Sequence, residues 1–209
     1  MNLKPSNCVL LLSGGMDSTL LAYRLVAEDK RPLCVTFGYG QRHAKETYYA
    51  QRVADRLQLR HAYHDIPIQS SSALRGTADV PQGFAADAPE QAATVVPHRN
   101  LAMLAVAATM LPQATIYVGA NQSDAAVYPD CRWWSFFDPF NEILKNTYGG
   151  EVVAPLVNMT KSEIVAEYLD RGIKLEESWS CYQGLEVPCG KCGPCIAITQ
   201  GVSEWQAKQ

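Results

Sequence analysis

The feature that most constrains the fold is an apolar run that ends in a glycine turn. Residues 8–12 (CVLLL) are continuously apolar, and residues 13–18 (SGGMDS) follow at once. A short run without polar alternation is typical of a strand that is buried on both faces. Residues 18–27 then continue with the apolar spacing of a helix. A buried strand that turns directly into a helix predicts the first unit of an α/β sheet.

The rest of the chain continues this alternation of strands and helices. Because strands alternate with helices, we expect a doubly wound parallel sheet covered on both faces. Residues 69–96 are polar, with glycines and prolines, which is typical of a lid or a binding loop. We expect one α/β domain over residues 1–175 and a small C-terminal lobe over 176–209. Strands are predicted over 31–37, 60–68, 114–120 and 151–155, and helices over 43–57, 100–111, 134–145 and 161–171.

Composition and charge favour an enzyme that acts on small molecules. The 209 residues have a formal net charge of -3 and contain no block of five lysines or arginines, which argues against a duplex-binding surface. The N-terminal residues lack the apolar core of a signal peptide, and no apolar run reaches the length of a membrane span. We therefore expect a cytoplasmic protein without a membrane partner and without direct binding to nucleic acid.

The loop at residues 13–19 has the composition of an anion site. Gly14 and Gly15 allow the backbone to turn sharply and to approach a ligand closely. Hydroxyl groups and the N–H groups at a helix start can bind phosphate. Asp17 suits a phosphate site when a divalent cation lies between them. An alternative is a plain strand-to-helix turn in which Asp17 caps the helix.

Four of the seven cysteines gather near the C-terminus, and their spacing predicts a metal site. They are separated by seven, two and two residues, and the close pairs are joined by glycines. In a reducing compartment such a cluster indicates metal binding rather than disulfides. A structural tetrahedral Zn²⁺ is the preferred interpretation, and an iron–sulfur cluster is the alternative. The predicted ligands are Cys181, Cys189, Cys192 and Cys195.

Several motifs resemble known families. The order S-G-G-x-D-S after a first strand resembles the PP-loop of the ATP pyrophosphatase superfamily, whose members cleave ATP between the α and β phosphates. Further stretches resemble the 7-cyano-7-deazaguanine synthase (preQ0 synthase) family within it, in that family's order. These stretches are VTFGYGQRH (35–43), VPHRN (96–100), YPDCR (128–132), PLVNMTKSEI (155–164) and SCYQGLEVPCGKCGPC (180–195).

The resemblance implies an adenine nucleotide alpha-hydrolase-like fold, a structural zinc ion at the four cysteines, and ATP with Mg²⁺. It implies ATP-dependent conversion of 7-carboxy-7-deazaguanine and ammonia to the nitrile through an acyl adenylate and an amide, in queuosine or 7-deazaguanine biosynthesis. A homodimer is also implied. The nucleotide-binding residues would be Leu12, Ser13, Gly14, Gly15, Met16, Asp17, Ser18, Thr19, Val35 and Phe37.

Residues outside the loop complete the expected site. Arg99 opens an apolar helix behind a long loop. Lys161 stands at a helix start, where the helix dipole disfavours a lysine unless it has a ligand. We therefore expect both residues to act on phosphates. We expect the base substrate to contact Gln41, Tyr128, Asp130 and Arg132, with Arg42 and His43 as further candidates. The alternative for Asp130 and Arg132 is that they form an ion pair on the surface.

The chain departs from the family pattern around the expected base pocket. Gly38 replaces an aspartate, His98 replaces a glycine, and Ala125, Ala126 and Val127 replace a different triplet before YPDCR; Ile198 replaces an arginine. These differences leave one alternative open, a related adenylating enzyme that stops at the amide or joins the acid to another amine. Two further alternatives belong to other classes. One is a tRNA thiolation enzyme, for which Cys131 would be the nucleophile. The other is a nucleotide-binding module that has lost catalysis, against which the intact loop, Arg99 and Lys161 argue.

Overall fold

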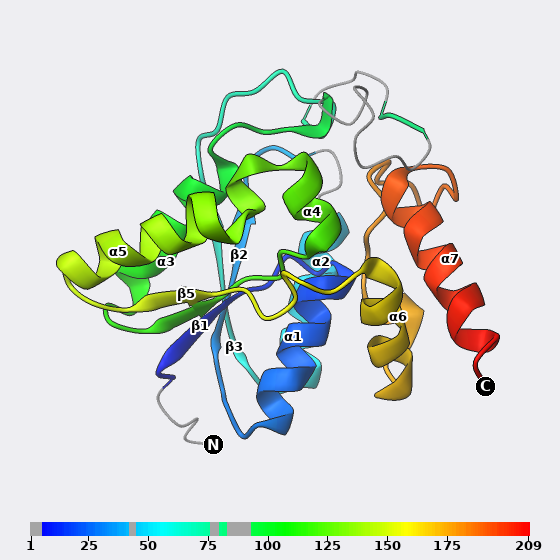
Figure 1. The fold of residues 1–209 in the computed structure, drawn as a ribbon, viewed down its shortest axis with the longest axis horizontal. Coiled ribbons are helices and arrows are strands. Elements are labelled where there is room, and N and C mark those ends of the chain that lie inside the picture. Colours follow the sequence, from blue (N-terminus) through cyan, green and yellow to red (C-terminus); the bar gives the residue numbers. More distant parts are fainter. Residues whose placement is uncertain (1–5, 42–44, 76–79, 83–92) are drawn as a thin grey trace.

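The sheet has five parallel strands in the order β3-β2-β1-β4-β5. We describe a computed structural model, and its described residues are 6–41, 45–75, 80–82 and 93–209. Val9 of β1 pairs with Leu33 of β2 on one side and with Ile116 of β4 on the other. The strands are β1 Cys8–Leu11, β2 Leu33–Gly38, β3 Arg60–Asp65, β4 Thr115–Tyr117 and β5 Glu151–Val153 (Figure 1).

Helices cover both faces of this sheet, each through its own apolar core. One core joins Leu10 of β1 to Leu21 and Ile164, and the other joins Val9 to Leu104 and Phe137. None of the helices in the described ranges is long and apolar enough to span a membrane. The first face carries α1 Met16–Ala27, α2 Lys45–Arg56 and α6 Lys161–Asp170, and the second carries α3 Arg99–Met110 and α5 Asp138–Asn146 (Figure 1).

The doubly wound parallel sheet predicted from the alternation of elements is confirmed. Most predicted elements are present with boundaries shifted by a few residues; the helix predicted at 134–145 starts as a π-helical turn, Trp133–Phe137, before α5. Within the described residues, two α-helices were not predicted, α4 Gln122–Val127 and α7 Gly193–Gln206. Both are short or weakly patterned, and α4 depends on a capping box between Asn121 and Asp124 rather than on an apolar stripe.

The C-terminal helix packs directly on the α/β domain. α7 lies against α6, as Figure 1 shows, and a Cβ atom at Gly201 would come within 2.8 Å of the Val165 side chain. The helices therefore approach more closely than a larger residue would allow. The domain boundary between residues 175 and 176 stays a prediction.

The strand order places the loop after β1 at the point where the chain switches from one side of β1 to the other in adding strands to the sheet. The chain runs outward from β1 to β3 and then returns to β4 on the other side of β1. Ligands of open α/β sheets bind beyond the carboxyl ends of the strands at such a point. Here the loop after β4 approaches closely, because a Cβ atom at Gly119 would lie 3.1 Å from the Ser18 nitrogen. The fold thus directs both loops at one crevice.

Gly14 fixes how this loop passes α2. Its φ of +91° lies in the left-handed region, and a Cβ atom there would lie 2.1 Å from the Glu46 carbonyl oxygen and 2.6 Å from the Ala50 nitrogen. Because both atoms belong to the α2 backbone, neither can move aside as a side-chain tip would. Only glycine fits this position.

We predict that Gly14→Ala destabilises the protein by about 2–4 kcal/mol, because a left-handed conformation and a backbone clash add together. The matched control is Gly172→Ala, where φ is +70° but nothing lies within 4 Å of the added Cβ. That control is expected to cost about 1–2 kcal/mol. Chemical denaturation of both variants measures the difference, and equal losses would contradict the backbone clash.

Candidate active site

Two adjoining cavities lie beyond the carboxyl ends of β1 and β4. The first cavity, of about 240 Å³, is lined on its apolar side by residues such as Val35, Phe37 and Leu104. The second cavity, of about 160 Å³, extends toward α6 and the start of α7. Both share one set of lining residues, so they form one continuous site. The shared residues are Ser13, Gly15, Asp17, Glu46, Asp124, Tyr128 and Tyr182.

The loop after β1 is held in shape by its own hydroxyl groups. Ser13 Oγ accepts a hydrogen bond from the Gly15 N–H at 3.1 Å, and Ser18 Oγ accepts from the Ser13 N–H at 3.2 Å. The Ser18 hydroxyl also lies 3.1 Å from both the Gly15 carbonyl oxygen and Ser13 Oγ. Gly15, and not Asp17, is the N-cap of α1. The alternative in which Asp17 caps this helix is therefore wrong.

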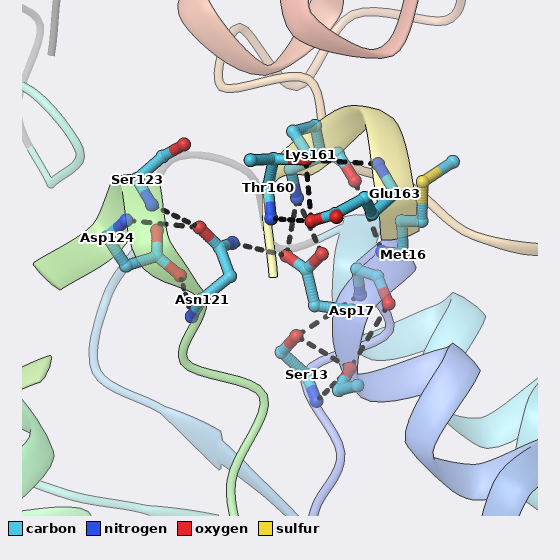
Figure 2. A network of polar contacts seen from close by, with 12 residues as sticks. Ser13, Met16, Asp17, Asn121, Ser123, Asp124, Thr160, Lys161 and Glu163 are labelled. Atoms are coloured by element: carbon cyan, nitrogen blue, oxygen red, sulfur yellow. Dashed lines mark hydrogen bonds and ion pairs between the residues drawn. The ribbon is translucent and has the colours of Figure 1, made fainter. Parts of the chain in front are cut away.

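Asp17 and Lys161 form an ion pair between two helix starts. Lys161 Nζ lies 2.6 and 2.7 Å from the two Asp17 carboxylate oxygens, and Asn121 Nδ2 lies 3.4 Å from one of them (Figure 2). A lysine in the first turn of a helix is disfavoured by the dipole, and the Asp17 carboxylate offsets this cost. Thr160 and Glu163 cap α6 reciprocally, which fixes the helix start and so the position of Lys161.

Arg99 enters the first cavity between two tyrosines. It donates a hydrogen bond to Tyr39 Oη at 3.1 Å, and its guanidinium carbon lies 5.5 and 6.0 Å from the ring centres of Tyr39 and Tyr128. Tyr128 Oη lies 2.8 Å from Thr94 Oγ1, which fixes its ring in turn. Aromatic faces attract a guanidinium without neutralising it. The positive charge of Arg99 therefore stays available to an anionic ligand.

Two further carboxyl groups face the junction of the cavities. Burial raises the pKa of Glu46 to about 8; the nearby Arg99 opposes this shift and Asp17 adds to it. Burial also raises the pKa of Asp124 to about 6, again with Asp17 adding and Lys161 opposing. Like charges in one site disfavour each other's ionised forms. The site therefore combines two basic side chains with carboxyls that bind protons or cations readily.

The loop and strand residues predicted to bind nucleotide occupy two layers. Gly14, Met16 and Thr19 are placed behind the loop, against α2 and the core. The other seven line the first cavity, and three of them line the second as well. The cavity-lining members are Leu12, Ser13, Gly15, Asp17, Ser18, Val35 and Phe37.

The four residues predicted to hold the base substrate are divided by the structure. Gln41 and Tyr128 line the first cavity, although the Gln41 amide also bonds to the backbone of Tyr39 and Phe37. Asp130 instead accepts from the Asn100 N–H at 3.1 Å, and Arg132 donates to the Ala125 carbonyl at 2.9 Å. Neither belongs to the described cavity lining. Their assignment to substrate stays a prediction, and Arg42 and His43 lie outside the described residues.

Two departures from the family pattern, Gly38 and His98, lie outside the described cavity lining, and the structure explains the first but not the second. A Cβ atom at Gly38 would lie 1.9 Å from Tyr63 Oη and 2.2 Å from Asp65 Oδ1. These side chains, joined by a 2.8 Å hydrogen bond, fill the space that a residue at 38 would need. His98 is an exposed N-cap of α3 with a φ of +59°, a conformation that glycine adopts more easily.

Several residues of the site were missed at the level of sequence. Glu46 lies three residues after GYGQRH in the sequence, Asn121 ends the loop after β4, and Ser180 and Tyr182 flank the first clustered cysteine. A search of every loop at the carboxyl end of a strand would have found Asn121 and Asp124. Ser180 and Tyr182 had no such signal, because their position depends on how the C-terminal segment folds back.

Cys131 is unsuited to the nucleophilic role that tRNA thiolation would give it. The side chain is buried, and Asn100 Nδ2 lies 3.2 Å from its sulfur. Burial raises the pKa of this thiol well above its usual range, and the nearby carboxylates of Asp124 and Asp130 add to the effect. Because the thiolate is the reactive form, Cys131 has the character of a structural cysteine.

The four C-terminal cysteines form one compact cluster. Their sulfur atoms all lie within 4.8 Å of one another. Sulfurs bound tetrahedrally at about 2.3 Å to one ion would lie about 3.8 Å apart, so the cluster fits a single metal ion. Burial raises the pKa of the Cys189 thiol, but N–H donors from Lys191 and Cys192 outweigh it and lower the pKa to about 7. Because all four ligand atoms are cysteine sulfurs, the donor set suits a cation that prefers thiolates.

We predict that Cys192→Ser lowers bound metal from about one ion per chain and reduces the midpoint of thermal unfolding, because the metal supplies folding energy. Cys34→Ala is the control, since Cys34 is a buried cysteine of β2 outside the cluster. Elemental analysis and calorimetry give both quantities. Undiminished metal content in Cys192→Ser would contradict a four-thiolate site.

The raised pKa of Glu46 makes a prediction about stability and pH. In the unfolded chain Glu46 loses its proton above its ordinary pKa of 4.5, whereas in the folded protein it keeps the proton until about pH 8. Wild-type stability therefore falls as pH rises between these two values. Glu46→Gln removes that penalty. We expect its advantage in Tm over wild type to grow between pH 5 and 8, whereas Glu142→Gln, at an exposed position on α5, shows no such trend. Parallel Tm curves for Glu46→Gln and wild type would contradict the burial argument.

Comparison with known proteins identifies the family. Residues 7–206 match the family described as Queuosine biosynthesis protein QueC. A 7-cyano-7-deazaguanine synthase from Hahella chejuensis is 39% identical over 204 residues, covering 93% of this chain and 87% of the relative. The enzyme of that name from Archaeoglobus fulgidus is 37% identical over 201 residues, covering 92% and 84%.

Among solved structures, an NMN synthetase from Francisella tularensis is similar in fold. It has a TM-score of 0.51 and 14% identity, and the match covers 98% of this chain and 85% of that one. This likeness supports the predicted adenine-nucleotide type of sheet and carries no inference about substrate. Sequence motifs and family match agree: the chain belongs to the QueC family of queuosine biosynthesis proteins.

Proposed function

We propose that this protein is a 7-cyano-7-deazaguanine synthase, an ATP-dependent ligase that joins 7-carboxy-7-deazaguanine and ammonia to give the nitrile. The observation that carries the proposal is the anion loop of Ser13–Ser18, which opens onto two cavities beside the Asp17–Lys161 pair. Such an arrangement suits a nucleotide phosphate chain between an apolar base pocket and a second, polar substrate pocket.

ATP would lie with its adenine in the first cavity, against Val35 and Phe37, and its phosphates on the loop. The loop N–H groups, the hydroxyl of Ser13, and the charges of Arg99 and Lys161 would then stabilise the negative charge that develops on pyrophosphate. Lys161 is held by Asp17 before ATP arrives, so its ammonium is already positioned.

The reaction needs two activations by the same groups. A substrate carboxylate oxygen attacks the α phosphorus and pyrophosphate leaves, which gives an acyl adenylate. Ammonia displaces AMP and loses a proton to give the amide. A second adenylation on the amide oxygen releases pyrophosphate again, and loss of AMP and of both amide protons gives the nitrile. Asp124 lines the junction, and because its pKa is about 6 it is ionised near neutral pH and can take up a proton there.

Two metal ions belong to the proposal. The cysteine cluster would hold a structural Zn²⁺ through Cys181, Cys189, Cys192 and Cys195, because four thiolates in a closed cluster leave no position for water. Mg²⁺ would accompany ATP and supply positive charge to the phosphates, with Asp17 and Asp124 as nearby carboxylates.

One reaction tests the function. Purified protein is incubated with Mg²⁺, ammonium, ATP and 7-carboxy-7-deazaguanine, and bases and nucleotides are identified by mass spectrometry. We expect the nitrile with two AMP per molecule formed. Amide as the final product, or a base left unchanged while AMP accumulates, would overturn the proposal in favour of a related adenylating enzyme.

Two variants test the roles of the ion pair. We predict that Asp17→Asn and Lys161→Met each lower kcat/KM for ATP by 100-fold or more, the effect of removing a preorganised charge from a transition state. Metal content at the cysteines should stay at the wild-type level, because the ion pair lies outside the cluster. Arg171→Met is a control, since it removes a basic residue of an ion pair outside the cavities. Activity retained by both test variants would contradict this assignment.

A further inference from the structure

The metal cluster and the anion loop are joined by three consecutive residues, Trp179, Ser180 and Cys181. Cys181 contributes its sulfur to the cluster. The Trp179 N–H donates to the Gly14 carbonyl oxygen at 2.9 Å, and the Ser180 hydroxyl accepts from the Met16 N–H at 3.3 Å. One short segment therefore contacts the loop on both sides of Gly15 while its next residue belongs to the metal site.

Trp179 makes this segment rigid. Its side chain is buried, and its indole N–H donates to the Cys181 carbonyl at 3.0 Å. The Lys45 ammonium lies 4.1 Å from its ring centre, and the Tyr49 ring packs against it with centroids 5.8 Å apart. Because Lys45 and Tyr49 belong to the first turns of α2, the tryptophan joins the cysteine cluster to the helix on which Gly14 rests.

The Ser180 hydroxyl is positioned to contact a ligand as well as the loop. Ser180 lines the second cavity, and a Cβ atom at Gly15 would lie 3.8 Å from its oxygen. A hydroxyl donates one hydrogen bond and accepts others. Among the described residues, the Ser180 hydroxyl has one hydrogen bond, which it accepts from the Met16 N–H. Its proton is therefore left for an acceptor in the cavity.

We propose that Ser180 is a further phosphate-binding residue, and that the metal cluster positions it and the loop through residues 179–181. In this arrangement the hydroxyl accepts from the α1 start and donates to a phosphate oxygen of ATP. The metal site then sets the geometry of the nucleotide site in addition to stabilising the C-terminal lobe. The inference rests on the proposed ATP-dependent function but is independent of which base is the substrate.

The first test measures nucleotide binding without a base substrate. Holoprotein carrying Ser180→Ala is titrated calorimetrically with α,β-methylene-ATP and Mg²⁺, an analogue that cannot be cleaved between the α and β phosphates. We expect Kd to rise about tenfold, the effect of one hydrogen bond to a charged group, with metal content unchanged. Ser180→Thr, which keeps the hydroxyl, should restore most of the affinity. Ser203→Ala is the matched control, because it removes a serine hydroxyl from α7 that bonds within its own helix.

The second test measures the coupling in wild-type protein. Metal is removed with a chelator, and hydrogen exchange of peptides over residues 12–20 is compared with that of peptides over β2. We expect exchange to rise in the loop while β2 keeps its protection. Unchanged loop exchange would overturn the coupling.

Wild-type affinity in Ser180→Ala would overturn the phosphate contact, and loss of metal from that variant would show that the hydroxyl is a structural part of the cluster instead. If wild type binds the analogue but forms no nitrile, the proposed function fails while the Ser180 inference stands. The two failures are therefore distinguishable.

Discussion

The close approach of the loop after β1 to the α2 backbone is the constraint on which the site depends. At Gly14 the loop lies so close to the α2 backbone that no side chain would fit between them. The Trp179 N–H of the C-terminal segment holds the loop from the other side. With the loop fixed, α1 begins at Met16 and directs Asp17 toward Lys161. The position of Asp17, and with it the ion pair to Lys161, follows from this packing contact.

Electrostatics then decide what the site can bind. Arg99 and Lys161 supply positive charge, and the carboxyl groups of three acidic residues lie at the same junction. These residues are Asp17, Glu46 and Asp124. Burial raises the pKa values of Glu46 and Asp124, so their ionised forms are costly unless a cation lies nearby. A triphosphate with its metal ion and an amine substrate together offer both kinds of charge, so the mixture of groups suits adenylation followed by amination.

Much of the fold could be predicted because its signals are local. The apolar run before Ser13, the glycine turn and the alternation of elements predict the parallel sheet, and the cysteine spacing predicts a metal cluster that the sulfur positions support. Contacts between distant segments could not be predicted. Ser180 contacts Met16 across 164 residues, and Asp130 accepts from the Asn100 N–H in the first turn of α3 instead of lining a described cavity. Such contacts depend on tertiary packing, which spacing along the chain does not encode.

The most direct test of the central claim, that this site transfers AMP to the substrate, follows oxygen rather than product. 7-Carboxy-7-deazaguanine labelled with ¹⁸O in both carboxylate oxygens is converted in the presence of ATP, Mg²⁺ and ammonium, and the nucleotides are analysed by mass spectrometry. Adenylation predicts one ¹⁸O in each AMP, because the attacking oxygen leaves with the phosphorus. Label in inorganic phosphate, with ADP as the nucleotide product, would contradict the account.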